Sequence, residues 1–297
     1  MTQNKREVYS YIAIAFIFSL LVHLIYIFMH HSDAGYLWNG QLSIVSNDGY
    51  YFGSGVQKVM NGLHLDNPLV PSLLDRGLVF VTVVLAKILP FTLDTIMLYM
   101  PAFFSSLVVI PLVLIGNLYN KPLWGFLSAL LASVAWSYYN RTLAGYYDTD
   151  MFALIMPYFI LYYLLKSIKE SSYTALYVAS IFSAIYPFLY NPGSSVLYAL
   201  AFVYAMYLLV FYRKEKFVYI FIGTFFISLI SIPIPILNMY QSLVKVAILT
   251  ITYFIFSKKE FSSKQTLYFS IISFILFALT SNALIQVYEK FNAYNSC

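Results

Sequence analysis

The sequence contains only one cysteine, Cys297. A single cysteine excludes an internal disulfide framework and any zinc site that needs several cysteines. Charge is also scarce: 10% of the 297 residues are charged and 61% are hydrophobic, compared with about 45–50% hydrophobic residues in ordinary soluble domains. This composition excludes a water-soluble globule, so we expect the chain to lie in a lipid bilayer.

Long apolar stretches recur from residue 8 to residue 285, which excludes a signal peptide followed by a secreted domain. A membrane-spanning helix needs about 20 mainly apolar residues. Stretches of about that length, bounded by charged residues, Pro or Asn, predict an all-α polytopic membrane protein with about nine transmembrane helices. The predicted spans are residues 8–29, 96–119, 123–139, 151–165, 173–189, 194–212, 217–236, 240–256 and 267–285.

A tenth apolar run, Leu78 to Leu89, is short, carries Lys87 and ends at Pro90. We expect it to be an interfacial helix rather than a span. It belongs to a long first loop, residues 30–95, whereas a short second loop covers residues 140–150. Connections longer than about 12–15 residues are usually functional or disordered, so the first loop is a candidate for function.

The basic residues indicate how the spans are oriented, because cytoplasmic loops are enriched in Lys and Arg. An N-terminus in the cytoplasm places 11 of the 17 basic residues in cytoplasmic turns. Treating residues 78–89 as a further span would reverse the orientation of every later loop. Arg213, Lys214 and Lys216 would then lie on the outer side of the membrane, against this enrichment. We therefore expect a cytoplasmic N-terminus, with both loops and the C-terminus on the outer side. The 11 residues are Lys5, Arg6, Lys121, Lys166, Lys169, Arg213, Lys214, Lys216, Lys258, Lys259 and Lys264.

Every aspartate of the chain then lies on the outer side. Acidic residues contribute little to topology, so this asymmetry has another cause, and a cation-dependent site on the outer face is one candidate. Asp148 and Asp150 precede the fourth span in the segment GYYDTDM, residues 145–151. Two carboxylates at this spacing can offer oxygen ligands to one Mg²⁺ or Mn²⁺ ion. The alternative is helix capping, which also favours Asp at a helix start and is the simpler interpretation for Asp150.

Asp48 lies in the segment NDGY, residues 47–50, which by itself indicates a turn. It follows the first span on the same side as Asp148, so the three aspartates are expected at one outer surface. Arg141 is the natural counter-charge, able to hold a carboxylate or to bind a phosphate with two hydrogen bonds. The alternative for Arg141 is an ordinary surface arginine at the end of the third span.

The remaining ionisable residues are weaker candidates. His23 lies inside the first span and is expected to be packed or hydrogen-bonded, although an intramembrane histidine is also a functional candidate. His30 and His31 are expected to be solvated at the membrane surface, and Lys245 to extend toward an interface. The segment NRT, residues 140–142, is formally a glycosylation acceptor, and here a structural role is expected.

Taken together, several segments resemble the bacterial single-subunit oligosaccharyltransferases of the PglB type, in the same order and at the same span positions. The resemblance extends over essentially all 297 residues. The segments that carry it are QL at 41–42, SNDGY at 46–50, LYM at 98–100, SSLVVIP at 105–111, ASVA at 132–135, SYYNRT at 137–142 and GYYDTDM at 145–151.

This resemblance implies a fold of the GT-C glycosyltransferase type, in a multi-pass protein of the bacterial inner membrane. It implies transfer of an oligosaccharide from a polyprenyl-pyrophosphate carrier to the Asn side chain of Asn-x-Ser/Thr acceptors, with Mg²⁺ or Mn²⁺ as cofactor. The metal ligands would be Asp48, Asp148 and Asp150. Asp48 would also contact the acceptor amide, so that Asp48, Arg141 and Asp150 are the expected catalytic residues. Tyr190 and Arg141 would lie near the lipid-linked donor.

The chain also departs from the family. Members run to roughly twice this length or more and carry a glutamate in a later outer loop and a soluble domain with a WWDYG motif. Neither is present, and Glu289 lies too early to be that glutamate. The segment NPG at 191–193, after Tyr190, also differs. We therefore expect a single transmembrane domain over 1–297 that is a truncated or short homologue.

Three alternatives stay open at this point. The first alternative is that the chain is not active alone but is an incomplete part of the enzyme that needs a second polypeptide. A related GT-C enzyme acting on another polyprenyl-linked sugar is the second alternative. A polytopic transporter is the third, and it is disfavoured because the predicted spans contain almost no ionisable residues apart from His23 and Lys245.

Overall fold

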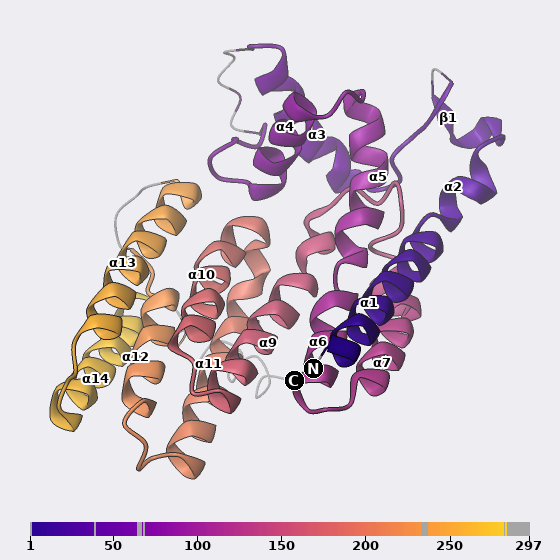
Figure 1. The fold of residues 1–297 in the computed structure, drawn as a ribbon. Helices are drawn as coiled ribbons and strands as arrows, with labels where there is room; N and C mark the ends of the chain where they lie inside the picture. The colour runs from indigo at the N-terminus through magenta and orange to yellow at the C-terminus, as the bar shows by residue number, and fades with distance from the viewer. Residues whose placement is uncertain are drawn as a thin grey trace, which may run out of the picture. The chain divides into compact units, whose positions relative to one another are not determined.

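The computed structural model describes residues 2–38, 40–63, 67, 69–232, 237–281 and 283. These residues are mainly helical and form two compact units, within Met1–Tyr162 and Tyr163–Cys297, each of which is described by itself (Figure 1). The prediction of a single transmembrane domain stays a prediction. Glu289 and Cys297 lie outside the described residues.

The first unit contains α1 (Thr2–His23), α2 (Ile25–His30), η1 (Ala34–Tyr36), β1 (Leu37–Trp38), β2 (Gln41–Leu42), α3 (Asn47–Met60), α4 (Gly77–Ile88), α5 (Leu93–Ser106), α6 (Val109–Leu118), α7 (Pro122–Val134), α8 (Trp136–Tyr139), η2 (Thr149–Phe152) and the start of α9 (Ile155–Lys169). The two strands are antiparallel, and Leu37 pairs with Leu42. The second unit contains the rest of α9, α10 (Tyr173–Leu189), η3 (Asn191–Gly193), α11 (Ser194–Phe211), α12 (Val218–Leu229), α13 (Asn238–Lys258) and α14 (Ser263–Thr280).

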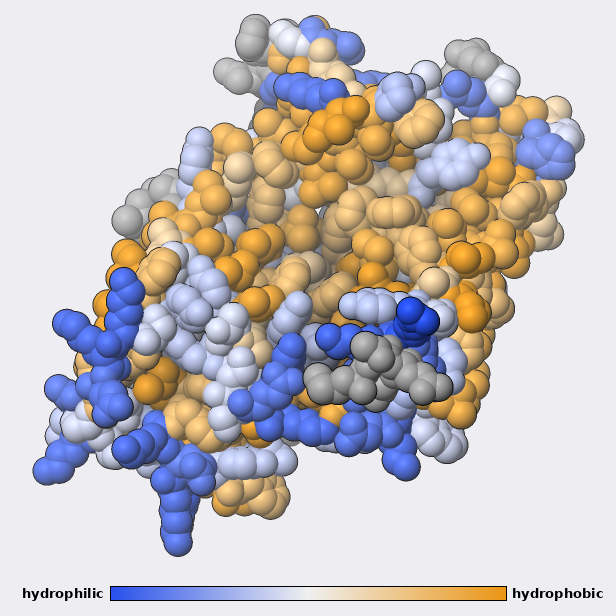
Figure 2. Space-filling model, in the orientation of Figure 1, coloured by the Kyte–Doolittle hydropathy of each residue, from blue (hydrophilic) through white to orange (hydrophobic). Residues whose placement is uncertain are grey.

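In the part of the chain that the structure describes, each predicted span contains a helix or a pair of consecutive helices, which confirms a polytopic helical membrane protein. Within the described residues, six segments are long and apolar enough to cross a membrane, and α7, α10 and α12 are shorter apolar helices. The short run at 78–89 forms α4, of 12 residues, the same length as α12, so its position at the membrane interface stays a prediction. Figure 2 shows hydrophobic side chains exposed over much of the visible face, as expected for helices that contact lipid.

Side-chain caps and small residues explain several local features. Ser46, Thr92 and Ser172 accept a backbone N–H at the starts of α3, α5 and α10, and Ser262 forms a capping box with Gln265 at the start of α14. In the first unit α1 packs on α6 and α7. A Cβ atom at Gly116 would lie 2.6 Å from the Cα of Gly125, so α6 and α7 approach this closely only because both positions are glycine.

Candidate active site

The second loop, residues 140–150, is joined by backbone hydrogen bonds to three other parts of the first unit. The N–H of Ala144 donates to the carbonyl of His23 at 2.8 Å, and the N–H of Gly145 donates to the carbonyl of Leu98 at 2.8 Å. The carbonyl of Gly145 accepts from the N–H of Val45 at 2.9 Å. The loop is therefore fixed to α1, to α5 and to the first loop, although these segments are far apart in the sequence.

The buried side chain of His23 adds a further link between α1 and the second loop. Its Nδ1 lies 2.7 Å from the carbonyl oxygen of Ser19 and its Nε2 lies 3.0 Å from the hydroxyl of Thr142. Because a carbonyl can only accept, Nδ1 carries a proton and donates it. The Thr142 hydroxyl also lies 2.7 Å from the carbonyl of Tyr138. The expectation that His23 is packed and hydrogen-bonded is confirmed.

Tyr147 connects the second loop to the first loop. Its buried phenol lies 2.6 Å from the hydroxyl of Thr82 on α4, and Thr82 donates in turn to the carbonyl of Leu78 at 2.8 Å, so Tyr147 is the donor of the first bond. A Cβ atom at Gly49 would lie 2.8 Å from the carbonyl oxygen of Tyr147. The first turn of α3, which contains Asp48, therefore lies directly against the second loop.

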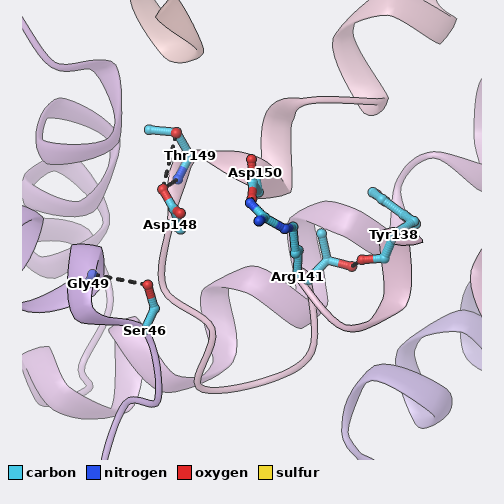
Figure 3. A network of polar contacts seen from close by, with 8 residues as sticks. Ser46, Gly49, Tyr138, Arg141, Asp148, Thr149 and Asp150 are labelled. Atoms are coloured by element: carbon cyan, nitrogen blue, oxygen red, sulfur yellow. Dashed lines mark hydrogen bonds and ion pairs between the residues drawn. The ribbon is translucent and has the colours of Figure 1, made fainter. Parts of the chain in front are cut away.

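Asp148 is 7% exposed and caps η2. Its Oδ1 accepts from the backbone N–H of Thr149 and from the Thr149 hydroxyl at 3.2 Å (Figure 3). Burial raises the pKa of Asp148, and the negative charges of Asp150 and Asp48 raise it further, whereas the bonds from Thr149 oppose this shift. Helix capping, which the sequence suggested more readily for Asp150, is thus performed by Asp148.

Arg141 is paired with Asp150. Its Nη1 donates to Oδ2 of Asp150 at 2.9 Å, and Figure 3 shows the two side chains pointing toward one another. The hydrogen bond and the charge of Asp150 raise the pKa of the guanidinium. Of the two roles that the sequence allows for Arg141, the structure shows the one in which it holds a carboxylate. The Arg141 side chain is 60% exposed, so most of its N–H groups face solvent.

Asp48 is exposed in the first turn of α3, whose N-cap Ser46 accepts from the N–H of Gly49 at 3.3 Å. The charges of Asp48, Asp148, Asp150 and Arg141 all act on the pKa of Tyr146, which burial raises. These four residues therefore lie in the neighbourhood of Tyr146 in the first unit, and their assignment to one functional site stays a prediction. Three aspartates face one arginine, which leaves an excess of negative charge there.

The chemistry of these donors fits a hard divalent cation, because such ions prefer carboxylate oxygens. Among the residues that the structure describes, no group of three or more His, Cys, Asp or Glu side chains is assembled as a metal site. Asp150 is engaged by Arg141, and Asp148 by Thr149. Metal binding by Asp48, Asp148 and Asp150 therefore stays a prediction.

The other candidates lie elsewhere. Tyr190 follows α10 in the second unit and stacks on Tyr186, with ring centroids 5.8 Å apart. In the first unit His30 lies 3.7 Å from Asp33 and stacks near Tyr36, and His31 is exposed. Lys245 is partly buried on α13. The roles of Tyr190 and Arg141 in donor binding stay predictions.

Thr82 and Tyr147 also support the site structurally and were not among the residues singled out from the sequence, whereas Thr142 belongs to the segment 140–142, for which a structural role was expected. The hydroxyl of Thr82 lies inside an apolar segment, and Tyr147 is adjacent to Asp148. A buried hydroxyl needs a hydrogen-bond partner, so their positions indicate buried bonds. The partners could not be inferred, because Thr82 and Tyr147 are 65 residues apart.

Comparison with known proteins agrees with the resemblance. The family described as "Oligosaccharyl transferase STT3, N-terminal" matches residues 14–295. The undecaprenyl-diphosphooligosaccharide–protein glycotransferase of Campylobacter jejuni (strain RM1221) is 42% identical over 212 residues, 71% of this chain and 30% of the relative. The dolichyl-phosphooligosaccharide–protein glycotransferase of Methanococcus voltae is 27% identical over 126 residues, 39% of this chain and 14% of the relative.

The fold is also similar to that of a solved archaeal protein. The structure of the oligosaccharyltransferase AglB from Archaeoglobus fulgidus, in complex with an inhibitory peptide and a dolichol-phosphate, covers 93% of this chain with a TM-score of 0.61 and 13% sequence identity. The match uses 37% of that protein, and the chain spans 30% of the length of the Campylobacter relative. From the family match, which extends over nearly all of its residues, the chain belongs to the oligosaccharyl transferase STT3 family, of which it carries the N-terminal part.

Proposed function

We propose that the chain carries the membrane part of an oligosaccharyltransferase, which transfers an oligosaccharide from a polyprenyl-pyrophosphate carrier to the Asn side chain of Asn-x-Ser/Thr acceptors. The observation that carries the proposal is that Asp48, Arg141, Asp148 and Asp150 lie in the neighbourhood of Tyr146 in the first unit. The two loops that bring them together are also the segments with which the chain resembles the family.

The location follows from the charge distribution. We place the protein in the bacterial inner membrane, with a cytoplasmic N-terminus and with both loops and the C-terminus in the periplasm. The support is the concentration of Lys and Arg in alternate turns, together with the bacterial origin of the Campylobacter relative. This orientation places all aspartates on the side where the acceptor would be met.

Each residue of the site has a role that its environment supports. Asp48 is exposed, so its carboxylate can accept the N–H groups of an acceptor amide. Arg141 holds Asp150 with one N–H group and can direct others at a departing pyrophosphate. Asp148 and Asp150 would join Asp48 in holding Mg²⁺ or Mn²⁺. A bound cation there would neutralise charge that develops on the pyrophosphate.

A second candidate function is that of an incomplete catalytic part, whose site is completed by another polypeptide or by further residues. Within the described residues the three aspartates are not assembled as a metal site, which is compatible with completion of the site by further groups. The transporter alternative loses support, because His23, one of its two intramembrane ionisable candidates, is held in structural hydrogen bonds.

The test is transfer of a lipid-linked oligosaccharide to a labelled Asn-x-Thr peptide by the purified chain with Mn²⁺. We expect transfer to be abolished by Asp48→Ala and retained by Asp33→Ala, which removes another exposed aspartate of the first loop. Equal transfer by wild type and Asp48→Ala would contradict the assigned role. Absence of transfer by folded wild-type protein would favour the second candidate, an incomplete catalytic part. In that case, a measurement of whether Mn²⁺ binding depends on Asp48 would still test the proposed metal site.

A further inference from the structure

A cavity of about 580 Å³ lies beside the first turn of α3 in the first unit. Its walls are the extended segment 41–44, one face of α3 and the first turns of α5. Gly49 and Tyr50, which directly follow Asp48, line it, whereas the four charged residues of the candidate active site are not among its lining residues. The cavity therefore adjoins that site without forming part of it. Its volume is within the range of about 300–1,000 Å³ found for small-molecule sites.

Three lining side chains have unused hydrogen-bonding capacity. Within the described part of the chain, the side chains of Gln41, Gln57 and Asp94 have no hydrogen-bond or ion-pair partner. They come from the three different walls. Each amide offers two N–H donors and a carbonyl acceptor, and the carboxylate offers acceptors only. The cavity therefore presents donors and acceptors from several directions at once.

Hydroxyl groups add further acceptors along the same walls. Ser54 donates to the carbonyl of Tyr51 at 2.7 Å, and Tyr50 donates to the carbonyl of Ile44 at 3.2 Å. Each hydroxyl proton is thus engaged, while the oxygen can still accept a bond from a ligand. The ring of Tyr50 is 59% exposed and gives the cavity a flat apolar surface.

This lining selects a class of ligand. Among the residues that the structure describes, no Lys, Arg or His lines the cavity, and the Asp94 carboxylate would repel an anion, so this lining disfavours a phosphate or pyrophosphate. A sugar ring both donates and accepts at each hydroxyl and has an apolar C–H face. Two amides, a carboxylate, hydroxyl oxygens and an exposed tyrosine ring satisfy these requirements together.

We propose that this cavity binds a sugar residue of the donor oligosaccharide, away from the bond that is broken. The inference rests on the proposed function and adds a subsite to it. Because Tyr50 and Gln57 belong to the same helix as Asp48, a sugar held there has a fixed position relative to the Asp48 carboxylate. The cavity would orient the glycan while the neighbouring charged residues act on the pyrophosphate end and on the acceptor.

The experiment measures binding of two free disaccharides, N,N′-diacetylchitobiose and lactose, to the full chain by saturation-transfer difference NMR. The detergent must lack a sugar headgroup, and no metal or lipid-linked donor is added. We expect at least one disaccharide to bind, and Gln57→Leu and Tyr50→Leu to weaken it about 5- to 10-fold, as expected for loss of one good contact. Both side chains are exposed, so the variants should fold.

The matched control is Tyr51→Leu, because Tyr51 is also on α3 and does not line the cavity. Tyr51→Leu should bind the disaccharide as the wild type does. Absence of binding of both disaccharides, equal binding by all variants, or cavity-dependent binding of an Asn-x-Thr peptide instead would overturn the proposal. If Asp48-dependent transfer is intact while sugar binding is absent, only the cavity assignment fails. If sugar binding depends on the cavity while transfer and Mn²⁺ binding are absent, only the proposed function fails.

Discussion

Asp148 combines two requirements that conflict in the absence of a cation. As the cap of η2, Asp148 is buried and accepts two hydrogen bonds from Thr149. The negative charges of Asp150 and Asp48 repel its ionised carboxylate. Burial and repulsion both favour the neutral acid and raise its pKa. A cation at this surface would reverse that preference. Asp148 is therefore the residue whose protonation should report the state of the site.

This conflict predicts a pH-dependent stability. The folded pKa of Asp148 lies above the value of about 3.9 in an unfolded chain. Between these two pKa values the folded state binds more protons, so the free energy of unfolding falls as the pH rises through this window. The Asp148→Asn variant keeps an oxygen that can accept from Thr149 and removes the charge. Without metal, it should have a higher melting temperature than the wild type at pH 7, with the difference shrinking toward pH 4.

The measurement is thermal unfolding in detergent across this pH range with a chelator present. Asp33→Asn is the control, because it removes the charge of an exposed aspartate in the first loop. A wild-type chain that is more stable than Asp148→Asn at pH 7 without metal would contradict the assignment.

At the scale of single residues, the sequence predicts which residues belong to the candidate site but not which hydrogen bonds and ion pairs they form. The expected positions of Asp48, Asp148, Asp150 and Arg141 come from the motifs and from the predicted side of the membrane. Which aspartate caps and which binds Arg141 depends on the path of residues 140–150. That path is determined by distant partners such as His23 and Leu98, which no local pattern reveals.

At the scale of elements, the contact between α3 and the second loop decides where Asp48 lies. Its closest point is Gly49 against the Tyr147 carbonyl. The Gly49→Ala variant would gain helix propensity, but its Cβ would lie 2.8 Å from a backbone oxygen and 3.1 Å from the Cδ1 of Ile44. Because a backbone atom cannot move away as a side chain does, we expect net destabilisation of about 1–3 kcal/mol.

Urea or thermal unfolding tests this expectation, with Gly35→Ala as the matched control. A Cβ at Gly35 would meet only the Oδ1 of Asp33, at an ordinary contact distance of 3.4 Å. Gly35→Ala should change stability little, and Gly49→Ala should also weaken any Mn²⁺ binding. Equal stability of the two variants would show that α3 is not held against the second loop in this way.

The bond between Tyr147 and Thr82 joins α4 to the second loop and can be removed alone. Tyr147→Phe deletes the donor, while Thr82 keeps its own bond to Leu78. We expect a loss of about 0.5–1.5 kcal/mol in the free energy of unfolding. Tyr11→Phe removes a hydroxyl that bonds Glu7 at an exposed position and should cost less. A larger loss of stability in Tyr11→Phe than in Tyr147→Phe, measured by chemical denaturation, would show that the buried bond makes no net contribution to the free energy of unfolding.

The elements themselves were largely predictable, because apolar length determines where helices cross a bilayer. The positions at which the predicted spans divide into two helices were less predictable. The first predicted span divides after His23, the second after Ser106 and the third after Val134. The second break lies after Ser106, and α5 continues through Pro101 before it, so the proline does not mark the break. Composition indicates that a segment is buried in lipid, whereas a break depends on single backbone hydrogen bonds.

At the scale of the whole molecule, the first unit contains all four charged residues of the candidate site, while the second contains Tyr190. The sequence does not divide the chain in this way, because apolar patterning is the same on both sides of residue 162. If Asp48, Asp148 and Asp150 bind a cation, the ion links the first loop to the second. Binding should then stabilise the folded chain as a whole, since an unfolded chain lacks the site.

The linkage gives a stabilisation of RT ln(1 + [L]/Kd), or about 2.7 kcal/mol when the ion is at 100 times its Kd. We therefore expect Mn²⁺ to raise the melting temperature of the wild-type chain at pH 7 and to raise it less as the pH falls, because protons compete with the cation for the carboxylates and burial raises the pKa of Asp148. The Asp48→Ala, Asp148→Ala double variant should lose this increase, whereas Asp33→Ala should keep it. An equal increase in the double variant would place the cation elsewhere. No increase in the wild type or in any variant would contradict cation binding by Asp48, Asp148 and Asp150.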